Sequence, residues 1–491
     1  MLALVPQPDG SFLSIPGTLQ SPDTLGVFII PNVPAGYYWL LLAPVPIVPP
    51  TAFWTSSSTF DSGRDEAGSP PPFGLNSQTT TFDFSLAGLD PAPATSWVAF
   101  VTDNLGIPTA FLSAQSGSTT LNTTLSLTDR VDWSKVNTAF LMQLEPVSVG
   151  SLNLLALGPE LSLSNLSLAS GATNPIDGTL QPSPQTSINL DVPGSQWAPL
   201  FQNVGPVAAT VQSAWLSIQP EPFVSGSNAN ASVVGPDLFM VSPNSAQAPY
   251  AFGGCLNIPF FLPPLGMAPI LTDQNFGTLP YGDPFPSSWT RALAFCQGAT
   301  VLVPLPGGVL NSFPIPIVDG EVIAPSGSAL VPVASQVQSP TVNGASLFTD
   351  STINTTAVTL AWSAPSSGTP PYGYTVLVLQ VLPVNQGIEL LSKGTYSTAK
   401  PSITLPPQAA GSVYLFLITA YVDGIANMET SPYRSALPTG SASVISAALT
   451  ISSGATAPAL RGDVKAFAEL SHRSMKMPAP GLSPQPAPRL H

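Results

Sequence analysis

Short stretches of alternating apolar and polar residues recur along most of the chain. The clearest stretch, TTTFDFSLAGL at residues 79–89, places Phe82, Phe84 and Leu86 on one face of a strand. Further stretches of this kind, such as SWVAFVTDN and TAFLMQLEPV, follow and are separated by turns that contain Pro, Gly or Asn. This pattern predicts an all-β chain of many short strands.

The proline content supports the same prediction. The 491 residues include 58 prolines and 39 glycines. A proline inside a helix removes a hydrogen bond and clashes with the preceding turn, so long helices are disfavoured. Hydrophobic residues make up 44% of the chain, enough to form buried cores, which separates it from proline-rich disordered chains. We therefore predict a multi-domain array of β-sandwiches.

The predicted array has five parts along the chain. They are a β-sandwich at 1–150, a β-rich unit at 151–222, an irregular β region rich in Pro and aromatic residues at 223–335, a β-sandwich at 338–452 and a flexible tail at 455–491. In the tail, Leu460, Val464 and Phe467 have the spacing of one side of a short amphipathic helix.

The C-terminal sandwich has the most specific pattern. Trp362 lies in the predicted strand AVTLAWSAP, Tyr374 lies in YGYTVLVLQVL, and VYLFLITAYVDG contains Tyr414 and, six residues later, Ala420. These residues resemble the fibronectin type III domain, in which the Trp packs across the core. The resemblance implies that the Tyr414 hydroxyl donates a hydrogen bond to the backbone at a sandwich corner. The resemblance also implies that this domain serves as a spacer or docking module.

A shorter resemblance opens the chain. Val27–Ile30 is predicted to be a strand, the turn at Pro34–Gly36 follows, and Tyr37–Leu42 is the predicted return strand. The segment NVPAGY at 32–37 resembles the carboxypeptidase regulatory-like, or transthyretin-like, β-sandwich, whose members act as passive folding or adhesion units. Such a sandwich begins with a strand before its Asp-Gly turn, here Asp9-Gly10. Because only eight residues precede this turn, we expect the chain to be truncated at its start.

The charge of the chain limits its partners and its location. The formal net charge is −14, the pI is about 4.2, and charged residues make up only 8%. An acidic chain without a basic stripe repels phosphate, so nucleic acid is excluded as a partner. No signal peptide is visible after Met1, and prolines interrupt the uncharged run Thr24–Phe60, so no membrane-spanning segment is expected. A polar but uncharged surface is common among exported proteins, which predicts an extracellular or cell-envelope location.

Few residues are available for catalysis or metal binding. His472 and His491 are the only histidines, and both lie in the tail. Cys255 and Cys296 lack the C-x-x-C spacing of a metal site. They form either one disulfide, as in an oxidising compartment, or two separate buried thiols. We therefore predict no enzyme activity, no catalytic residues, no metal and no cofactor.

Aromatic residues are the candidates for ligand binding. Trp39 and Trp54 lie close together in the first part, and Tyr281 and Trp289 lie in the third. Exposed aromatic rings stack on the apolar faces of sugars, whereas buried ones form the core of a sandwich. Both interpretations are open at this point.

Two functions follow from these patterns. The first is a non-enzymatic exported or cell-envelope protein that acts as an adhesion, scaffold or binding component. The alternative is a carbohydrate-binding accessory portion of a polysaccharide-acting system, whose strongest form would be a pair of carboxylates across a sugar cleft. The partner is then an unidentified protein or a glycan.

Overall fold

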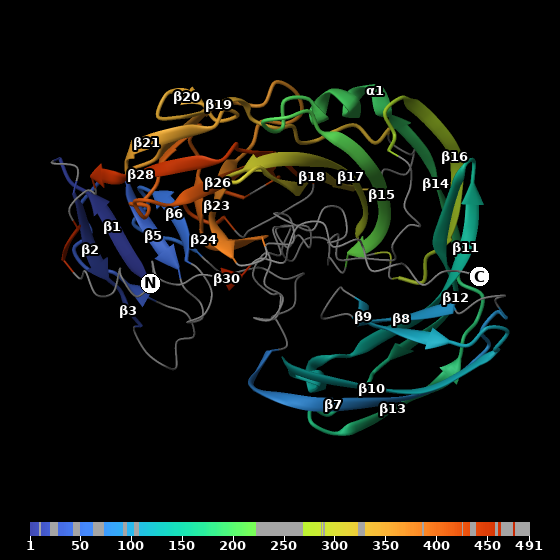
Figure 1. The fold of residues 1–491 in the computed structure, drawn as a ribbon. Coiled ribbons are helices and arrows are strands. Elements are labelled where there is room, and N and C mark those ends of the chain that lie inside the picture. Colours follow the sequence, from blue (N-terminus) through green and yellow to red (C-terminus); the bar gives the residue numbers. More distant parts are fainter. Residues whose placement is uncertain are drawn as a thin grey trace.

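The chain is almost entirely β-structure (Figure 1). The computed structural model describes residues 1–8, 11–19, 28–42, 50–61, 73–91, 96–102, 108–221, 269–285, 287, 290–322, 329–384, 387–424, 426–432, 438–456, 460–462 and 475–476. Within these residues the strands form several sheets that pack face to face, which confirms the predicted all-β array of sandwiches. No helix of the described part is long and apolar enough to cross a bilayer.

The first sandwich lies at the bottom of Figure 1. One of its sheets has the order β10 (Thr120–Val131), β7 (Phe73–Ala87), β13 (Thr173–Thr179), and the other has the order β12 (Leu152–Ser164), β11 (Thr138–Val149), β8 (Ser96–Thr102), β9 (Pro108–Ala114). Phe82, Phe84 and Leu86 of β7 are buried between the sheets, as the alternation predicts. Trp133, in the short 3₁₀ helix η1 (Trp133–Lys135), contacts Phe82 edge to face with 4.8 Å between ring centroids.

A long hairpin connects this sandwich to the rest of the molecule. Strands β11 and β12 pair antiparallel along their whole length, with Val149 opposite Leu152 at the turn. The predicted boundary between 150 and 151 therefore falls inside this hairpin, so the two predicted parts share one ladder. At the upper end of the hairpin, Val149 joins a second core.

The second core lies under a small two-stranded sheet. This sheet consists of β14 (Gln185–Pro193) and β16 (Asp273–Gly282), and β14 continues into α1 (Gly194–Trp197) and the 3₁₀ helix η2 (Ala198–Phe201). Trp197 is fully buried there, and its indole ring contacts Phe295 with 4.7 Å between centroids. Leu330 and Ala442 complete this core from more distant parts of the chain.

The largest sheet contains 15 of the described strands and extends across the top of Figure 1. Its main path, in order, is β15 (Thr210–Glu221), β17 (Thr290–Leu305), β18 (Val309–Val322), β27 (Thr439–Ile445), β26 (Val413–Val422), β23 (Gly373–Val384), β24 (Gly387–Thr398), β6 (Thr51–Thr55), β5 (Tyr38–Leu42), β1 (Leu2–Pro6), β2 (Phe12–Pro16) and β29 (Leu460–Gly462). Off this path, β28 (Leu449–Thr456) pairs with β26 and β21 (Ser351–Thr355), and β30 (Met475–Lys476) pairs with β24.

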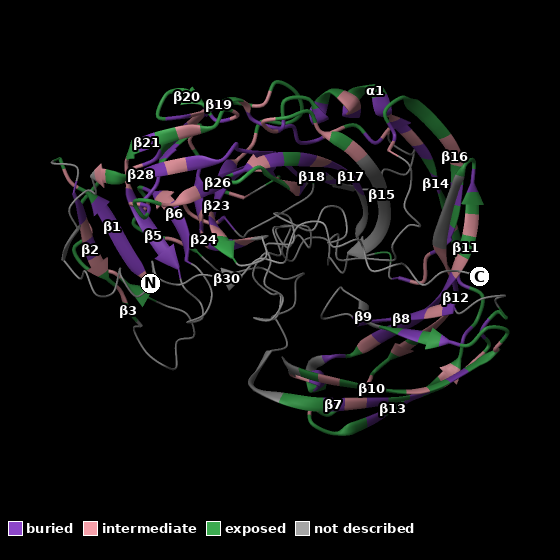
Figure 2. Cartoon of the chain, viewed as in Figure 1, coloured by how far each residue is buried: buried purple, intermediate pink, exposed green. Residues whose placement is uncertain are grey.

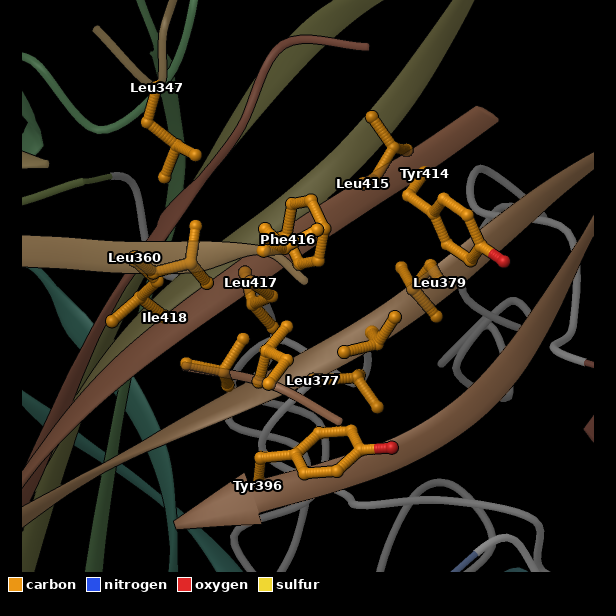
Figure 3. Packing of buried hydrophobic residues seen from close by; sticks show 14 of the residues in the cluster. Leu347, Leu360, Leu377, Leu379, Tyr396, Tyr414, Leu415, Phe416, Leu417 and Ile418 are labelled. Atoms are coloured by element: carbon orange, nitrogen blue, oxygen red, sulfur yellow. The ribbon is translucent and has the colours of Figure 1, made fainter. Parts of the chain in front are cut away.

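The C-terminal part places a second sheet against this path. That sheet has the order β20 (Ala345–Ser346), β19 (Gln338–Val342), β22 (Thr359–Ser363), β25 (Ser402–Thr404). Leu360 of β22 packs against Leu377 of β23 and Phe416 of β26 in one large core (Figure 3). Trp362 contacts Tyr374 edge to face, as expected for residues that point inward. Figure 2 shows β23 and β26 as buried along most of their length.

Two tyrosine hydroxyls lie within this core (Figure 3). Burial, partly offset by a hydrogen bond with Gln408, raises the pKa of Tyr396 to about 12. The Tyr414 hydroxyl accepts a hydrogen bond of 3.1 Å from the backbone N–H of Ala409. The backbone contact predicted for Tyr414 is therefore present with the opposite sense, because the backbone is the donor.

Replacing Tyr414 by Phe is expected to lower the free energy of unfolding by about 1 kcal/mol, because the N–H of Ala409 loses the buried hydroxyl that accepts its hydrogen bond. Chemical denaturation followed by circular dichroism measures the change. Tyr372→Phe removes a half-buried hydroxyl whose hydrogen bond, to the carbonyl oxygen of Pro432 at 3.5 Å, is long and weak, and it provides the matched control. An unchanged midpoint for Tyr414→Phe would contradict a structural role of this hydroxyl.

The N-terminal strands differ from the prediction in their pairing. Strand β4 (Phe28–Ile29) pairs with β3 (Thr18–Leu19), while the predicted return strand, β5, pairs with β1 and β6. The expected strand before Asp9-Gly10 is present as β1, although Asp9 and Gly10 themselves lie outside the described residues. The hairpin pattern predicted strand positions, but the partner of each strand depends on residues far away in the sequence.

The predicted tail helix is wrong at its first residue. Leu460 belongs to β29, which pairs in parallel with β2, and Leu460 lies opposite Phe12. Val464 and Phe467 lie outside the described residues. The apolar spacing of this segment fits a helix, but an available edge of the N-terminal sheet provides backbone partners for an extended conformation.

Candidate functional site

The four predicted sugar-stacking residues do not form one exposed platform. Trp39 is fully buried on β5, and Tyr281 is buried on β16 in the second core. Trp54 on β6 is half-buried, and Trp289 lies outside the described residues. The prediction is therefore wrong for Trp39 and Tyr281, whose rings fill cores, and it identifies one partly accessible ring in Trp54.

Trp54 belongs to a row of aromatic rings that leads from the core to the surface. Cross-strand pairing of β5 and β6 places Trp39 directly opposite Trp54, with 5.1 Å between ring centroids. On the core side of this pair, the Tyr396 ring of β24 contacts Trp39 edge to face, with 5.5 Å between ring centroids. On the surface side, the Tyr37 ring stacks on Trp54 with 5.7 Å between ring centroids and an interplanar angle of 18°. We call Tyr37, Trp54 and the polar groups around them the Tyr37 cluster.

Charged groups at the Tyr37 cluster come from the C-terminal part of the chain. The Lys400 ammonium lies 3.4 Å from the centroid of the Tyr37 ring, a cation–π contact. The Tyr37 hydroxyl donates to Glu429 Oε1 at 3.0 Å, and Ser56 Oγ donates to Oε2 of the same carboxylate at 3.2 Å. The cluster is thus made by one segment after β24, one turn after β26 and the N-terminal strands.

The turn that carries Glu429 is fixed to the N-terminal strands along its length. Thr55 Oγ1 donates to the carbonyl oxygen of Glu429 at 2.7 Å, and the N–H of Asp61 donates to the carbonyl oxygen of Thr430 at 2.7 Å. Met428 is buried in a small core that also contains Phe53. Together with the Tyr37 cluster, these contacts join the turn after β26 to the N-terminal strands.

The side chains of the Tyr37 cluster form a structural junction: they hold two parts of the chain together. Tyr37 already stacks on Trp54 and has a cation over its ring, so the ring area open to a sugar is small. Both oxygens of the Glu429 carboxylate already accept hydrogen bonds. Sequence reasoning identified Trp54 but missed Lys400 and Glu429, because only pairing of β6 with β24 brings these distant residues together.

Replacing Glu429 by Ala is expected to lower the free energy of unfolding by about 1 kcal/mol, since two side-chain hydrogen bonds are lost at a half-buried site. Glu429→Gln keeps one amide oxygen for Tyr37 and should have a smaller effect. Limited proteolysis gives a second measurement: cleavage near residues 56–61 should become faster in Glu429→Ala only. Equal effects of both substitutions would contradict the junction.

The cysteine prediction concerns one described residue. Cys296 is completely buried on β17, opposite Trp215 of β15, and it is disulfide-bonded. Cys255 lies outside the described residues. The pairing of Cys255 with Cys296 stays a prediction.

A pair of carboxyl groups lies at a separate position, on the first sandwich. Burial, followed by the interaction with Asp90 in the turn after β7, raises the pKa of Glu145 on β11 to about 7. Sequence reasoning left room for a carboxylate pair without identifying one. Asp90 is exposed and Glu145 is half-buried, so the two acids lie at the surface of the sandwich.

The chain was compared with families and individual proteins. No protein-family model matches it, and no curated protein matches it. The Tyr37 cluster is therefore interpreted from its geometry alone.

Proposed function

We propose that the protein is a non-enzymatic exported or cell-envelope β-protein that acts as an adhesion, scaffold or binding component. One observation carries the proposal: an unbroken path of paired strands joins the N-terminal β1, β5 and β6 to the C-terminal β24 and β23. The first and last parts of the chain are thereby held in one sheet. Pairing of distant segments in one sheet gives the rigid frame that an adhesion, scaffold or binding component needs when other molecules attach to it.

We further infer that residues 338–452 are fibronectin type III-like and that the first strands are transthyretin-like. Support for the first inference comes from the inward positions of Trp362, Tyr374 and Tyr414 between two facing sheets. A sandwich of this kind hosts many unrelated functions, so it supports a class of protein only. The role of a spacer or docking module follows from that class.

The carbohydrate-binding alternative has less support. Trp39 and Tyr281 are buried, and Trp54 packs between Tyr37 and Trp39. A sugar-binding platform needs a ring face that is open to solvent. The Tyr37 cluster instead uses its rings and its carboxylate for contacts within the chain.

Two measurements test the proposed function. Antibody detection in fractions of the source cells should find the protein in the medium or the envelope, and recovery in the cytosol alone would contradict the location. The full chain on a glycan array should show no retention and no hydrolysis. Retention that is lost in Trp54→Ala would favour the carbohydrate-binding alternative, and hydrolysis of any glycan would contradict a non-enzymatic role.

A further inference from the structure

Four aromatic rings form a continuous row from the core of the large sheet to its surface. The Tyr396 ring lies 5.5 Å from that of Trp39, and the Trp39 ring lies 5.1 Å from that of Trp54, measured between centroids. The row ends with Tyr37, stacked on Trp54 at 5.7 Å. Tyr396 and Trp39 are buried, whereas the last two rings are half-buried. Tyr and Trp have the most easily oxidised aromatic rings in proteins, so rings in contact can pass electrons along the row.

The two buried rings are poor places for an oxidised state. Loss of one electron turns an indole into a cation, and a charge inside a core is costly unless it is paired. Release of the indole proton would remove the charge, but within the described part of the chain Trp39 Nε1 has no hydrogen-bond partner to accept it. Burial also raises the pKa of the Tyr396 hydroxyl to about 12, so its proton is held tightly.

The surface end of the row has the proton acceptor that the buried end lacks. The Tyr37 hydroxyl donates to Glu429 Oε1 at 3.0 Å, a distance at which a proton can pass directly to a carboxylate. Ser56 Oγ donates to the other oxygen of this carboxylate at 3.2 Å and holds it in place. Tyr37 can therefore lose an electron and a proton together and become a neutral radical.

Lys400 favours the same end of the row. Its ammonium lies 3.4 Å from the centroid of the Tyr37 ring, and Tyr37 stacks on Trp54. A cation on Trp54 is repelled by this nearby positive charge, whereas a neutral radical on Tyr37 is not. The charges around the row thus direct an oxidised state outward to Tyr37.

We propose that the row Tyr396–Trp39–Trp54–Tyr37 is a relay that carries oxidising equivalents away from the core to Tyr37. A diffusible one-electron oxidant, such as an inorganic radical, takes one electron from a ring of the row and is reduced. Tyr37 then supplies one electron to that ring through Trp54, and its phenol proton moves to Glu429 Oε1. The products are the restored ring, a neutral Tyr37 radical and an uncharged Glu429. A small hydrogen-atom donor in solution, such as ascorbate, returns a hydrogen atom to Tyr37, and Glu429 releases its proton to water.

The relay protects the part of the sheet that joins the two ends of the chain. Trp39 lies on β5 and Tyr396 on β24, and β6 pairs with both strands. Oxidation products of these rings carry additional polar atoms, which are costly to bury in a packed core. This role is independent of the proposed adhesion, scaffold or binding function.

Oxidation of the full chain by the azide radical, generated by radiolysis in the presence of a nitroso spin trap, tests the relay. Peptide mapping by mass spectrometry locates spin-trap adducts on tyrosines and ring-opened products on tryptophans. In the wild type, Tyr37 should carry the main adduct of the row, and Trp39 and Trp54 should stay intact. Tyr372 is also half-buried, lies outside the row and donates to the carbonyl oxygen of Pro432, so its adduct should be several-fold smaller.

Three conservative variants separate the relay from direct attack on Tyr37. In Trp54→Phe, which keeps a ring that the azide radical does not oxidise, the Tyr37 adduct should fall several-fold. In Glu429→Gln, which keeps an acceptor oxygen but is not a base, the adduct should also fall and oxidation should move to Trp54. In Tyr37→Phe, both Trp54 and the buried Trp39 should become oxidised, whereas Tyr372→Phe should leave them intact.

Three results would overturn the proposal. A Tyr37 adduct that is unchanged in Trp54→Phe would show direct attack by the oxidant. Equal adducts in the wild type and Glu429→Gln would show that the carboxylate takes no part, and intact tryptophans in Tyr37→Phe would show that nothing was relayed. Near-UV circular dichroism checks that each variant keeps the fold. If Trp54→Phe does not fold, the comparisons with Glu429→Gln and Tyr37→Phe decide.

Discussion

Replacing Trp197 by Ala is expected to lower the free energy of unfolding by about 4 kcal/mol. Trp197 is fully buried in the second core, and its ring contacts Phe295 with 4.7 Å between centroids. Its indole N–H donates to the carbonyl oxygen of Leu330 at 2.7 Å. Truncation leaves a large cavity and removes the partner of a buried carbonyl, so the packing and hydrogen-bond losses add.

Urea denaturation followed by circular dichroism measures this change, and Trp197→Phe separates its two causes. Phe retains most of the packing and lacks the N–H, so a loss of about 1–2 kcal/mol is expected. Leu310→Ala, which truncates a side chain on β18 that is 61% exposed, should change stability by no more than about 0.5 kcal/mol. A loss for Trp197→Ala as small as that for Leu310→Ala would contradict the central place of Trp197 in this core.

Strand positions were predictable from the sequence because they depend on nearest neighbours. Phe82, Phe84 and Leu86 alternate with polar residues, and all three are buried. Trp362 and Tyr374 are inward-facing for the same reason. A strand with one buried face repeats every two residues, so the pattern can be recognised without knowledge of the partner strand.

Strand partners were not predictable in the same way. Strand β6 pairs in parallel with β24, more than 300 residues later, and β7 pairs in parallel with β13. Nothing in the local pattern of Thr51–Thr55 distinguishes these partners from any other apolar strand. The predicted division into consecutive parts therefore missed the sheet that unites the two ends of the chain.

The same limit applies to the candidate site residues. A Trp on a strand with both faces covered has the same sequence surroundings as an exposed one, so the sequence left both a sugar-stacking and a core position open for Trp39, which the structure places in the core. Asp90 and Glu145 are neighbours only in the fold, where Gln143, two residues before Glu145 on β11, binds the backbone of Asp90. These are properties of a three-dimensional ladder and have no signal in the spacing of the two acids.

Three buried amide side chains bind the backbone of irregular segments, a role that the sequence does not reveal. Gln143 and Gln297 are each buried, and each binds both the backbone N–H and the carbonyl oxygen of one residue distant in the sequence, Asp90 and Ile270 respectively. Asn174 does the same with the peptide of Ala169. Each amide supplies the donor and the acceptor that a neighbouring strand would supply in a regular sheet. Backbone groups of irregular segments are thereby hydrogen-bonded.

Asp319 provides a charged version of this arrangement and the second large prediction. Its carboxylate is buried on β18 and accepts hydrogen bonds from the N–H groups of Val333 and Ala334 at 2.8 and 3.1 Å. Replacing Asp319 by Ala should lower the free energy of unfolding by about 3 kcal/mol, because two buried donors lose a charged acceptor. Asp83→Ala removes an exposed carboxylate on β7 and should cost no more than about 0.5 kcal/mol.

A double-mutant cycle with Gly440 shows whether the Asp319 carboxylate acts through this local geometry. A Cβ on Gly440 would lie 2.6 Å from Asp319 Oδ1 and 2.9 Å from the Cβ of Ala334, so Gly440→Ala should also be destabilising. With Asp319→Ala already present, the first of these clashes is gone, and Gly440→Ala should then cost less than in the wild-type chain. Strictly additive losses, measured by urea denaturation, would mean that the two positions do not meet. The dependence of β27 on a glycine opposite β18 would then need another cause than the buried carboxylate.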